Sequence, residues 1–246
     1  AGVGVADDGE GAAAADFGGD IGHGAIIPVA MPELPDITVY AESLAAKVRG
    51  DTLNRVRIGS PFLLRSAVPP IASAEGRQAV AIERLGKRVV IALDGELFLV
   101  IHLMIAGRLH WHAALGKPPA KTALAIFEFN GGTLALTEAG TQRRASLHLV
   151  AGRDALQAMD PGGIDVMHCT PAEFAAQLAA ENHTLKRSLT NPQLFSGIGN
   201  AYSDEILHRA RMSPVALTRG LDAEAAQRLL DATRAVMSEW MQRLRE

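Results

Sequence analysis

Apolar side chains recur at two spacings along the chain, first at helical spacing and then at every second position. Residues 35–49 read PDITVYAESLAAKVR, in which apolar residues fall three or four positions apart. A proline opens this segment and Gly50 follows it, as is typical of helix ends. The spacing predicts one amphipathic helix over residues 35–49.

After this helix the apolar period falls to two, the period of a strand with one buried face. Asp94-Gly95 and Asn130-Gly131-Gly132 stand between consecutive segments and favour hairpin turns. Because no helical segment separates the strands, a two-layer antiparallel sandwich is favoured over a parallel sheet. The predicted strands are Thr52–Ile58, Ala79–Leu85, Arg88–Leu93, Leu97–Leu103, Ala123–Phe129 and Thr133–Glu138.

Helical spacing returns beyond about Asp154. The predicted helices are Pro171–Glu181, Leu185–Thr190, Asn200–Arg211 and Asp222–Leu244. The fold class is therefore α+β: residues 31–152 form a leading helix and an antiparallel β-sandwich domain, and residues 153–246 form a helical domain. The last helical pattern runs to Glu246 without a stop signal, so we expect the natural protein to continue.

Residues 1–30 are a third kind of sequence. They hold eight Gly, eight Ala and five acidic residues, with no Lys or Arg. So few apolar side chains leave the ordering entropy uncompensated, and we expect a disordered or non-native extension. There is no basic region that would mark a secretory signal. The composition changes at Met31, which we interpret as the natural start, with a read-through product, tag or fusion remnant before it.

Charge and cysteine content narrow the picture only slightly. The chain has 24 Lys and Arg against 27 Asp and Glu, a net charge of −3 that does not indicate a nucleic-acid partner. Residues 31–246 hold all the basic residues and lack five of the acidic ones, so their net charge is +2. The single Cys169 excludes an internal disulfide and a zinc site with two or more thiolates from this chain. The apolar stretch Leu97–Gly107 is too short to span a membrane and predicts a buried strand.

A glycine pair precedes one predicted helix. Gly197 and Gly199 lie directly before the helix that opens with Asn200. Glycines allow close approach of a backbone, and a helix N-terminus offers free amides, so this segment is a candidate phosphate seat. A lone G-x-G is more often a plain turn, although the neighbouring Lys186 and Arg187 favour an anionic partner.

A more specific signal begins at residues 31–36, MPELPD, which resemble the N-terminus of the formamidopyrimidine-DNA glycosylase and endonuclease VIII family. In that family, loss of the initiator Met leaves a free N-terminal proline. Further segments match in order, and the last of them resembles the family's helix-two-turn-helix. These segments are Leu85–Arg88, Ile101–Gly107, Arg143-Arg144, Leu185-Lys186 and Leu194–Glu205. Five matches in register rarely arise by chance.

The resemblance implies a bifunctional DNA glycosylase and abasic-site lyase of base excision repair. Its partner would be double-stranded DNA containing damaged bases or abasic sites, with no membrane association, and the enzyme would be a cytoplasmic monomer. Family members usually close with a Cys-rich zinc finger. Because this chain has none of those cysteines, we predict no cofactor here and expect zinc only in a complete family member. Truncation is favoured over a zinc-independent relative.

The resemblance also implies catalytic residues. Pro32 would be the nucleophile, because an α-amino group has a pKa of ~7.7–8.0 and is partly neutral near pH 7. Glu33 would act as general acid and base. Lys87 matches the family's catalytic lysine, implicated in proton transfer or in holding a phosphate. Taken alone, Glu33 is an acidic residue favoured near a helix start, and Lys87 is a solvated lysine in a hairpin.

Several residues would contact DNA by the same resemblance. They are His102, Lys186, Gly197, Gly199 and Asn200 toward the backbone, and Ile105, Arg143 and Arg144 toward the bases. The family's typical gap-filling Met and Phe are replaced here by Ile105 and Ala145, and Ala145 is too small to act as a wedge. The lesion class and the opposite-base preference therefore stay open.

Two alternatives remain from the residues themselves. In the chain as given, the nitrogen of Pro32 is tied up in an amide with Met31, and an amide is not a nucleophile. A catalytically silent DNA-binding member of the family is therefore the competing interpretation. His110 and His112 share one strand face, but two histidines without a third ligand do not make a metal site, so we predict none.

Overall fold

The computed structural model describes residues 31–113, 123–139 and 143–246, so the predictions for residues 1–30 lie outside it. Helix α1 spans Leu34–Val48. The Glu33 amide donates to Asp36 Oδ2 at 2.9 Å, which satisfies one of the amides that a helix start leaves unpaired. Gly50 follows the helix with a φ of +83°. The predicted helix is thus confirmed to within one residue at each end.

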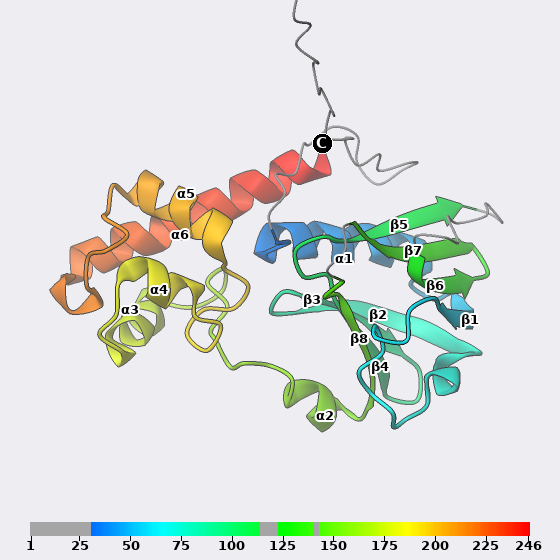
Figure 1. Ribbon diagram of the computed structural model, residues 1–246. Coiled ribbons are helices and arrows are strands. Elements are labelled where there is room, and N and C mark those ends of the chain that lie inside the picture. Colours follow the sequence, from blue (N-terminus) through cyan, green and yellow to red (C-terminus); the bar gives the residue numbers. More distant parts are fainter. Residues whose placement is uncertain (1–30, 114–122, 140–142) are drawn as a thin grey trace, which may run out of the picture.

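The strands form one antiparallel sheet of order β5-β7-β6-β1-β2-β3-β4-β8 that folds over on itself. Strand β1 pairs with β6 along most of its length but reaches β2 only through Thr52 and Leu53, so the sheet turns at this junction. Two four-stranded layers result, which confirms the sandwich (Figure 1). The strands are β1 Thr52–Ile58, β2 Arg77–Leu85, β3 Arg88–Leu93, β4 Leu97–His102, β5 Gly107–Ala113, β6 Ala123–Phe129, β7 Gly132–Glu138 and β8 Ser146–Ala151.

The predicted strand Leu97–Leu103 is confirmed to within one residue, since β4 ends at His102. The wider apolar stretch 97–107, which was expected to be a buried strand, does not continue as one, because Met104 takes a φ of +55° in the turn that leads to β5. At Gly107 an added Cβ would lie 2.3 Å from the Leu103 carbonyl oxygen, so only glycine allows so tight a turn. The predicted strands also omitted β5 and β8, although Leu147 and Leu149 alternate on the buried face of β8.

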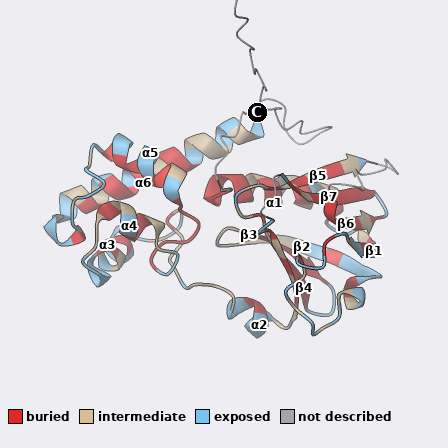
Figure 2. Cartoon of the chain, viewed as in Figure 1, coloured by how far each residue is buried: buried red, intermediate tan, exposed pale blue. Residues whose placement is uncertain are grey.

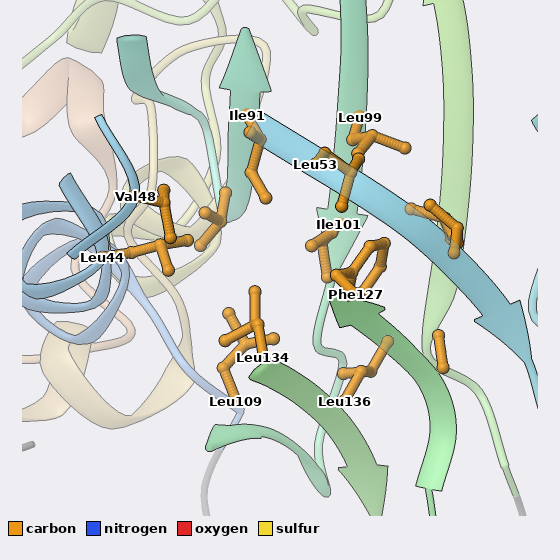
Figure 3. Close-up of a cluster of buried hydrophobic side chains, with 14 of the residues drawn as sticks. Leu44, Val48, Leu53, Ile91, Leu99, Ile101, Leu109, Phe127, Leu134 and Leu136 are labelled. Carbon is orange, nitrogen blue, oxygen red and sulfur yellow. The ribbon is translucent and has the colours of Figure 1, made fainter. Parts of the chain in front are cut away.

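A single apolar cluster fills the space between the two layers (Figure 3). Ile91, Leu99 and Ile101 come from one layer, and Phe127 and Leu136 come from the other. Each fully buried side chain of this size stabilises the fold by about 1.5–3 kcal/mol. Helix α1 adds its own apolar face to this cluster, which fixes the start of the helix against the sandwich.

The layer formed by β2, β3, β4 and β8 has a smaller apolar core on its outer face. Here β3 and β4 present Val90, Phe98 and Val100 to Leu156 of the short helix α2 (Arg153–Gln157). This helix was not predicted.

The helical half has its own core and lies beside the sandwich (Figure 2). Its helices are α3 Pro171–Ala180, α4 Leu185–Thr190, α5 Asn200–Ala210 and α6 Ala223–Arg245. There are also two short 3-10 turns: η2 Thr218–Gly220 lies in this half, and η1 Ile71–Ala74 lies in the β half. Asp222 caps α6 by accepting from the Ala225 amide at 2.7 Å. Leu34 of α1 belongs to this helical core, so the same helix serves both halves. None of the helices in the described part of the chain is long and apolar enough to cross a membrane.

Candidate active site

Glu33 is the centre of the candidate site. It lies just before α1 and is only 2% exposed. One carboxylate oxygen accepts from the Gly199 amide at 2.5 Å and the other from the Ala201 amide at 3.1 Å. Next to it, the Leu34 amide donates to the Gly197 carbonyl at 2.9 Å. The start of α1 is therefore bound directly to the start of α5.

Burial raises the pKa of Glu33, while the charge of Lys87 and the backbone hydrogen bonds oppose that rise. The carboxyl group therefore keeps a proton to a higher pH than an exposed glutamate does. A carboxyl group with a raised pKa is a better candidate for a general acid than an exposed glutamate.

The glycine pair before α5 has a different use from the predicted phosphate seat. The amide of Gly199 is committed to the Glu33 carboxylate and is not open to a phosphate. A Cβ added at Gly199 would lie 2.2 Å from Lys87 Nζ and 2.3 Å from Glu33 Oε1. Gly199 thus leaves the room in which the lysine and the carboxylate approach the same backbone. Gly197 takes a φ of +83° in the preceding turn.

Lys87 enters this space from the hairpin between β2 and β3, whose turn is made by Gly86 with a φ of +60°. The sequence predicted this hairpin. Considered without the family resemblance, it also predicted that Lys87 would be solvated. Instead, burial lowers the pKa of Lys87, and the charge of Glu33 works against that shift. The two groups are therefore a coupled acid and base, held together by segments that lie far apart in the β half of the chain.

A cavity of about 460 Å³ opens beside Glu33 and Lys87. Ile105, 43% exposed, and Asn200 reach it as well. Pro32 is buried and does not line it, and the nitrogen of Pro32 carries the Met31 acyl group. The complete lining is Met31, Glu33, Lys87, Ile105, Thr190, Gly199, Asn200 and Ala201. Met31 therefore lines the space directly next to the candidate nucleophile.

A second cavity of about 190 Å³ adjoins the first and is lined partly by the same residues, Met31, Lys87 and Thr190. His102 and Arg88 reach it from neighbouring strands, where they are register partners. Burial, followed by the charges of Arg88 and Lys87, lowers the pKa of His102 to about 4. A neutral imidazole at this position donates or accepts a hydrogen bond without adding charge.

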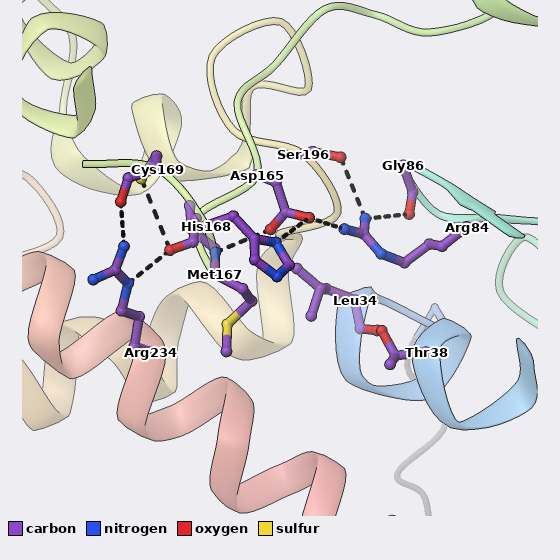
Figure 4. Close-up of polar contacts among 11 residues, drawn as sticks. Leu34, Thr38, Arg84, Gly86, Asp165, Met167, His168, Cys169, Ser196 and Arg234 are labelled. Carbon is purple, nitrogen blue, oxygen red and sulfur yellow. Dashed lines mark hydrogen bonds and ion pairs between the residues drawn. The ribbon is translucent and has the colours of Figure 1, made fainter. Parts of the chain in front are cut away.

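Arg84 was not predicted as a site residue, yet it links the two halves (Figure 4). From β2 its guanidinium reaches Asp165 Oδ2 at 2.6 Å, Ser196 Oγ at 3.3 Å and the Gly86 carbonyl at 3.1 Å. One side chain thereby joins the lysine hairpin to the segment before Gly197. A basic residue in a strand carries no pattern that would have indicated this contact.

Three predicted DNA contacts lie apart from the cavities. Lys186 Nζ pairs with Asp204 at 2.7 Å, and this pair connects α4 to α5. Arg143 and Arg144 are exposed before β8 and line neither cavity. The amides of Arg144 and Ala145 donate to the buried carboxylate of Glu138 at 2.9–3.2 Å. Glu138, another residue missed from the sequence, therefore fixes the segment that carries both arginines.

The described residues do not fit a zinc site. They contain no group of three or more His, Cys, Asp or Glu side chains placed to hold a metal ion. His110 instead lies 3.0 Å from Thr137 Oγ1. The Sγ atom of Cys169 lies 3.8 Å from the Val166 carbonyl, and burial raises the pKa of this thiol.

Comparison with known proteins identifies families and structures that are similar to this chain. The pattern of the formamidopyrimidine-DNA glycosylase N-terminal domain matches residues 31–145, and that of the formamidopyrimidine-DNA glycosylase H2TH domain matches residues 159–244. The formamidopyrimidine-DNA glycosylase of Solibacter usitatus is 32% identical over 85% of this chain and 76% of its own length. That of Thermus thermophilus is 33% identical over 85% and 75%.

Solved structures agree. The crystal structure of the MutM (Fpg) protein from Thermus thermophilus superimposes with a TM-score of 0.73 at 31% identity, covering 86% of this chain and 76% of the other. A Lactococcus lactis Fpg mutant in complex with Fapy-dG containing DNA gives 0.78 at 20% identity, covering 86% and 79%, and supports the fold alone. The chain is thus a β-sandwich protein with a helix-two-turn-helix domain. It belongs to the formamidopyrimidine-DNA glycosylase and endonuclease VIII family.

Proposed function

We propose that this chain is a bifunctional DNA glycosylase and abasic-site lyase that repairs double-stranded DNA containing oxidised bases or abasic sites. Relatives of this family carry the name formamidopyrimidine-DNA glycosylase, and one solved neighbour is bound to DNA with an abasic site. The observation that carries the proposal is the buried Glu33 carboxylate, held on two α5 amides beside Lys87 and next to Pro32.

The first step requires the nitrogen of Pro32 as a free secondary amine. That nitrogen attacks the sugar C1′ atom, and the bond between C1′ and the damaged base breaks, with the electron pair leaving on the base, which takes up the amine proton. Glu33 then gives its proton to the sugar ring oxygen as the ring opens, a role that its raised pKa favours. Opening of the ring leaves an iminium ion between Pro32 and the sugar.

The second step is elimination. The iminium ion withdraws electrons, so a base removes a proton from C2′ and the electron pair expels the 3′ phosphate. Glu33, now ionised, accepts that proton. Lys87 faces the same space with a lowered pKa, and it exchanges protons with Glu33 or holds the departing phosphate. His102 and Arg88 line the adjoining cavity and are placed for a second phosphate of the same strand.

The test is a panel of duplexes, each with one oxidised base or an abasic site, treated with protein that begins at Pro32. Base release and strand cleavage are measured separately. We expect both on at least one oxidised-base duplex and cleavage on the abasic duplex. Glu33→Gln should lose base release while its affinity for DNA stays within about twofold. Base release without any strand cleavage would contradict the lyase assignment.

One observation favours a second candidate, a DNA-binding protein without catalysis. Met31 blocks the nitrogen of Pro32 and lines both cavities. Both candidates predict that the full chain and the chain beginning at Pro32 bind abasic DNA. Only the enzyme candidate predicts that the chain beginning at Pro32 cleaves it. Equal inactivity of the two forms would favour the silent candidate. The monomeric state remains a prediction, to be tested by sedimentation.

A further inference from the structure

A loop of the β half, Ser60–Ser66, holds an aromatic ring out in solvent. Phe62 is 74% exposed, whereas its neighbour Leu63 is 2% exposed and belongs to the sandwich core. The loop backbone is tied to β8: the Arg65 amide donates to the Leu147 carbonyl at 2.8 Å, and the Leu147 amide donates to the Leu63 carbonyl at 2.9 Å. The ring therefore projects from a fixed backbone.

The loop lies at the end of the sheet that carries the candidate site. Leu64 bridges Leu147 in the parallel sense, and Phe62 lies in the turn just before this bridge, where the Leu63 amide donates to the Ser60 carbonyl at 3.1 Å. Across the next pair, Ser146 is the partner of His102. The order is β3, β4, β8 and then the loop.

Basic side chains join the cavity to this loop. Arg88 and His102 are register partners, His102 and Ser146 are register partners, and His148 lies two residues after Ser146 on the same face of the sheet. Burial lowers the pKa of His148, and the charges of Arg88 and Arg65 lower it further. Arg88 and His148 act on His102 in the same way. Asp160 is the carboxylate near Arg88, and Arg65 forms no ion pair with any residue that the structure describes. The row is complementary to a phosphate backbone.

We propose that loop 60–66 is a second DNA contact, in which Phe62 packs into the base stack beside the extruded nucleotide and Arg65 binds a phosphate of the same duplex. The inference rests on the proposed function, because only a base-extruding enzyme leaves a gap to fill. Such a gap takes an apolar wedge. Ile105 supplies one from the cavity side. Ala145, 3% exposed, offers only a buried methyl group, and Phe62 projects from the loop beside the start of β8.

The competing view is that Phe62 is an exposed residue without a partner, since single exposed apolar residues are common. Val68, 85% exposed before the 3-10 turn η1, provides the matched control. If exposure alone decided the effect, removing either side chain would leave DNA affinity unchanged. Leu is the conservative replacement for Phe62, because it keeps the apolar bulk of the wedge but not its aromatic face.

The test uses the full chain and measures affinity by fluorescence anisotropy, so that catalysis is not required. One duplex carries a tetrahydrofuran abasic analogue, and the other has the same sequence without damage. Phe62→Ala should weaken binding to the analogue duplex about tenfold and to the undamaged duplex less than threefold. Phe62→Leu should recover at least half of that loss on a logarithmic scale, and Val68→Ala should change neither affinity.

Arg65→Met should weaken binding to both duplexes alike and lower the slope of log Kd against log salt by about one. Melting temperatures check that each variant folds. An unchanged affinity of Phe62→Ala for the analogue, or an equal loss on both duplexes, overturns the wedge. If the unaltered chain does not prefer the analogue duplex, the proposed function fails with it. If the preference is present and Phe62→Ala keeps it, only this inference fails.

Discussion

Two regions line adjoining cavities and differ in how their charges are paired. At the start of α5, the anion is a side chain of the protein itself: Glu33 accepts from the amides of Gly199 and Ala201. At the end of the sheet, Arg88 and His102 face a cavity with Lys87, and Glu33 is the one carboxylate lining either cavity in the described chain. In the first region the protein supplies both the hydrogen-bond donors and the anion. In the second region it supplies the cations, which are complementary to a phosphate.

The difference separates two tasks that a nucleic-acid enzyme must perform. A carboxylate that transfers protons needs a fixed position and a raised pKa: the amides at the helix start fix the position of Glu33, and burial raises its pKa against their effect. Cations that hold a DNA strand need an open partner site, because their binding free energy comes from the phosphates. Lys87 belongs to both regions, and the predictions below separate them, beginning with the largest effect.

Gly199→Ala should abolish the site, because the new Cβ would lie 2.2 Å from Lys87 Nζ and 2.3 Å from Glu33 Oε1. Displacing both groups of the acid–base pair should lower the rate of base release about 10⁴-fold. Gly220→Ala, where an added Cβ meets nothing within 4 Å, is the matched control. A Gly199→Ala protein that retains a tenth of the activity would show that the approach of Lys87 to Glu33 is not needed.

Arg84→Met should remove the side-chain contacts that join the lysine hairpin to the segment before Gly197. It leaves Asp165 without its partner at 2.6 Å and removes the bonds to Gly86 and Ser196. We expect a loss of about 1–3 kcal/mol in the free energy of unfolding and a roughly tenfold fall in kcat with little change in KM. Urea unfolding and single-turnover kinetics measure the two effects.

The control for Arg84→Met is Arg57→Met, which breaks an exposed pair with Glu128. Such a pair contributes about 0.2–1 kcal/mol. If both variants lose the same stability and neither changes kcat, Arg84 has no role in joining the halves.

His102→Gln should change the pH dependence of stability. In the folded protein the pKa of His102 lies at about 4, below its usual 6.5, so the unfolded chain takes up a proton that the folded chain refuses. Stability is therefore full above pH 6.5 and falls as the pH drops toward 4. Removing this histidine should reduce that fall by about 1–2 kcal/mol at pH 5.

Melting temperatures between about pH 7.5 and 4.5 measure the change for His102→Gln, with His208→Gln, an exposed histidine of α5, as control. Parallel curves for the unaltered protein and His102→Gln would mean that the imidazole is not shielded from protonation.

Lys186→Met should give the smallest effect. Its ion pair with Asp204 is exposed on both sides, so its loss should cost only about 0.2–1 kcal/mol of stability. DNA affinity should fall about threefold if Lys186 leaves Asp204 for a phosphate. Asp204→Asn frees the lysine and should tighten binding. Opposite signs for these two variants in a salt titration would support the contact, and no change in either would exclude it.

The sequence predicted the fold well because apolar and polar residues alternate regularly in strands that have one face exposed to solvent. It missed the strands β5 and β8 and the five-residue helix α2, and it expected the apolar stretch of β4 to continue to Gly107, because a run of apolar residues does not reveal where the chain reverses. Periodicity records which side of an element is buried but not where a buried element ends.

The candidate site was only partly predictable. The resemblance indicated Glu33 and Lys87, and the structure brings them together at Gly199. It did not indicate Arg84 or Glu138, because their partners, Asp165 and the amides before β8, are distant or backbone groups that leave no pattern in the sequence. The glycine pair was a candidate phosphate site, because sequence alone does not reveal that the Glu33 carboxylate already accepts from the Gly199 amide.

The most direct test of the account asks which atom forms the covalent bond to DNA. Protein beginning at Pro32 is treated with an abasic duplex and borohydride, and the adduct is located by peptide mass spectrometry. We predict one adduct, on the peptide that begins with Pro32, and none with the full chain, whose Pro32 is blocked. An adduct on Lys87, or an equal yield from the full chain, would contradict the assignment of Pro32 as nucleophile.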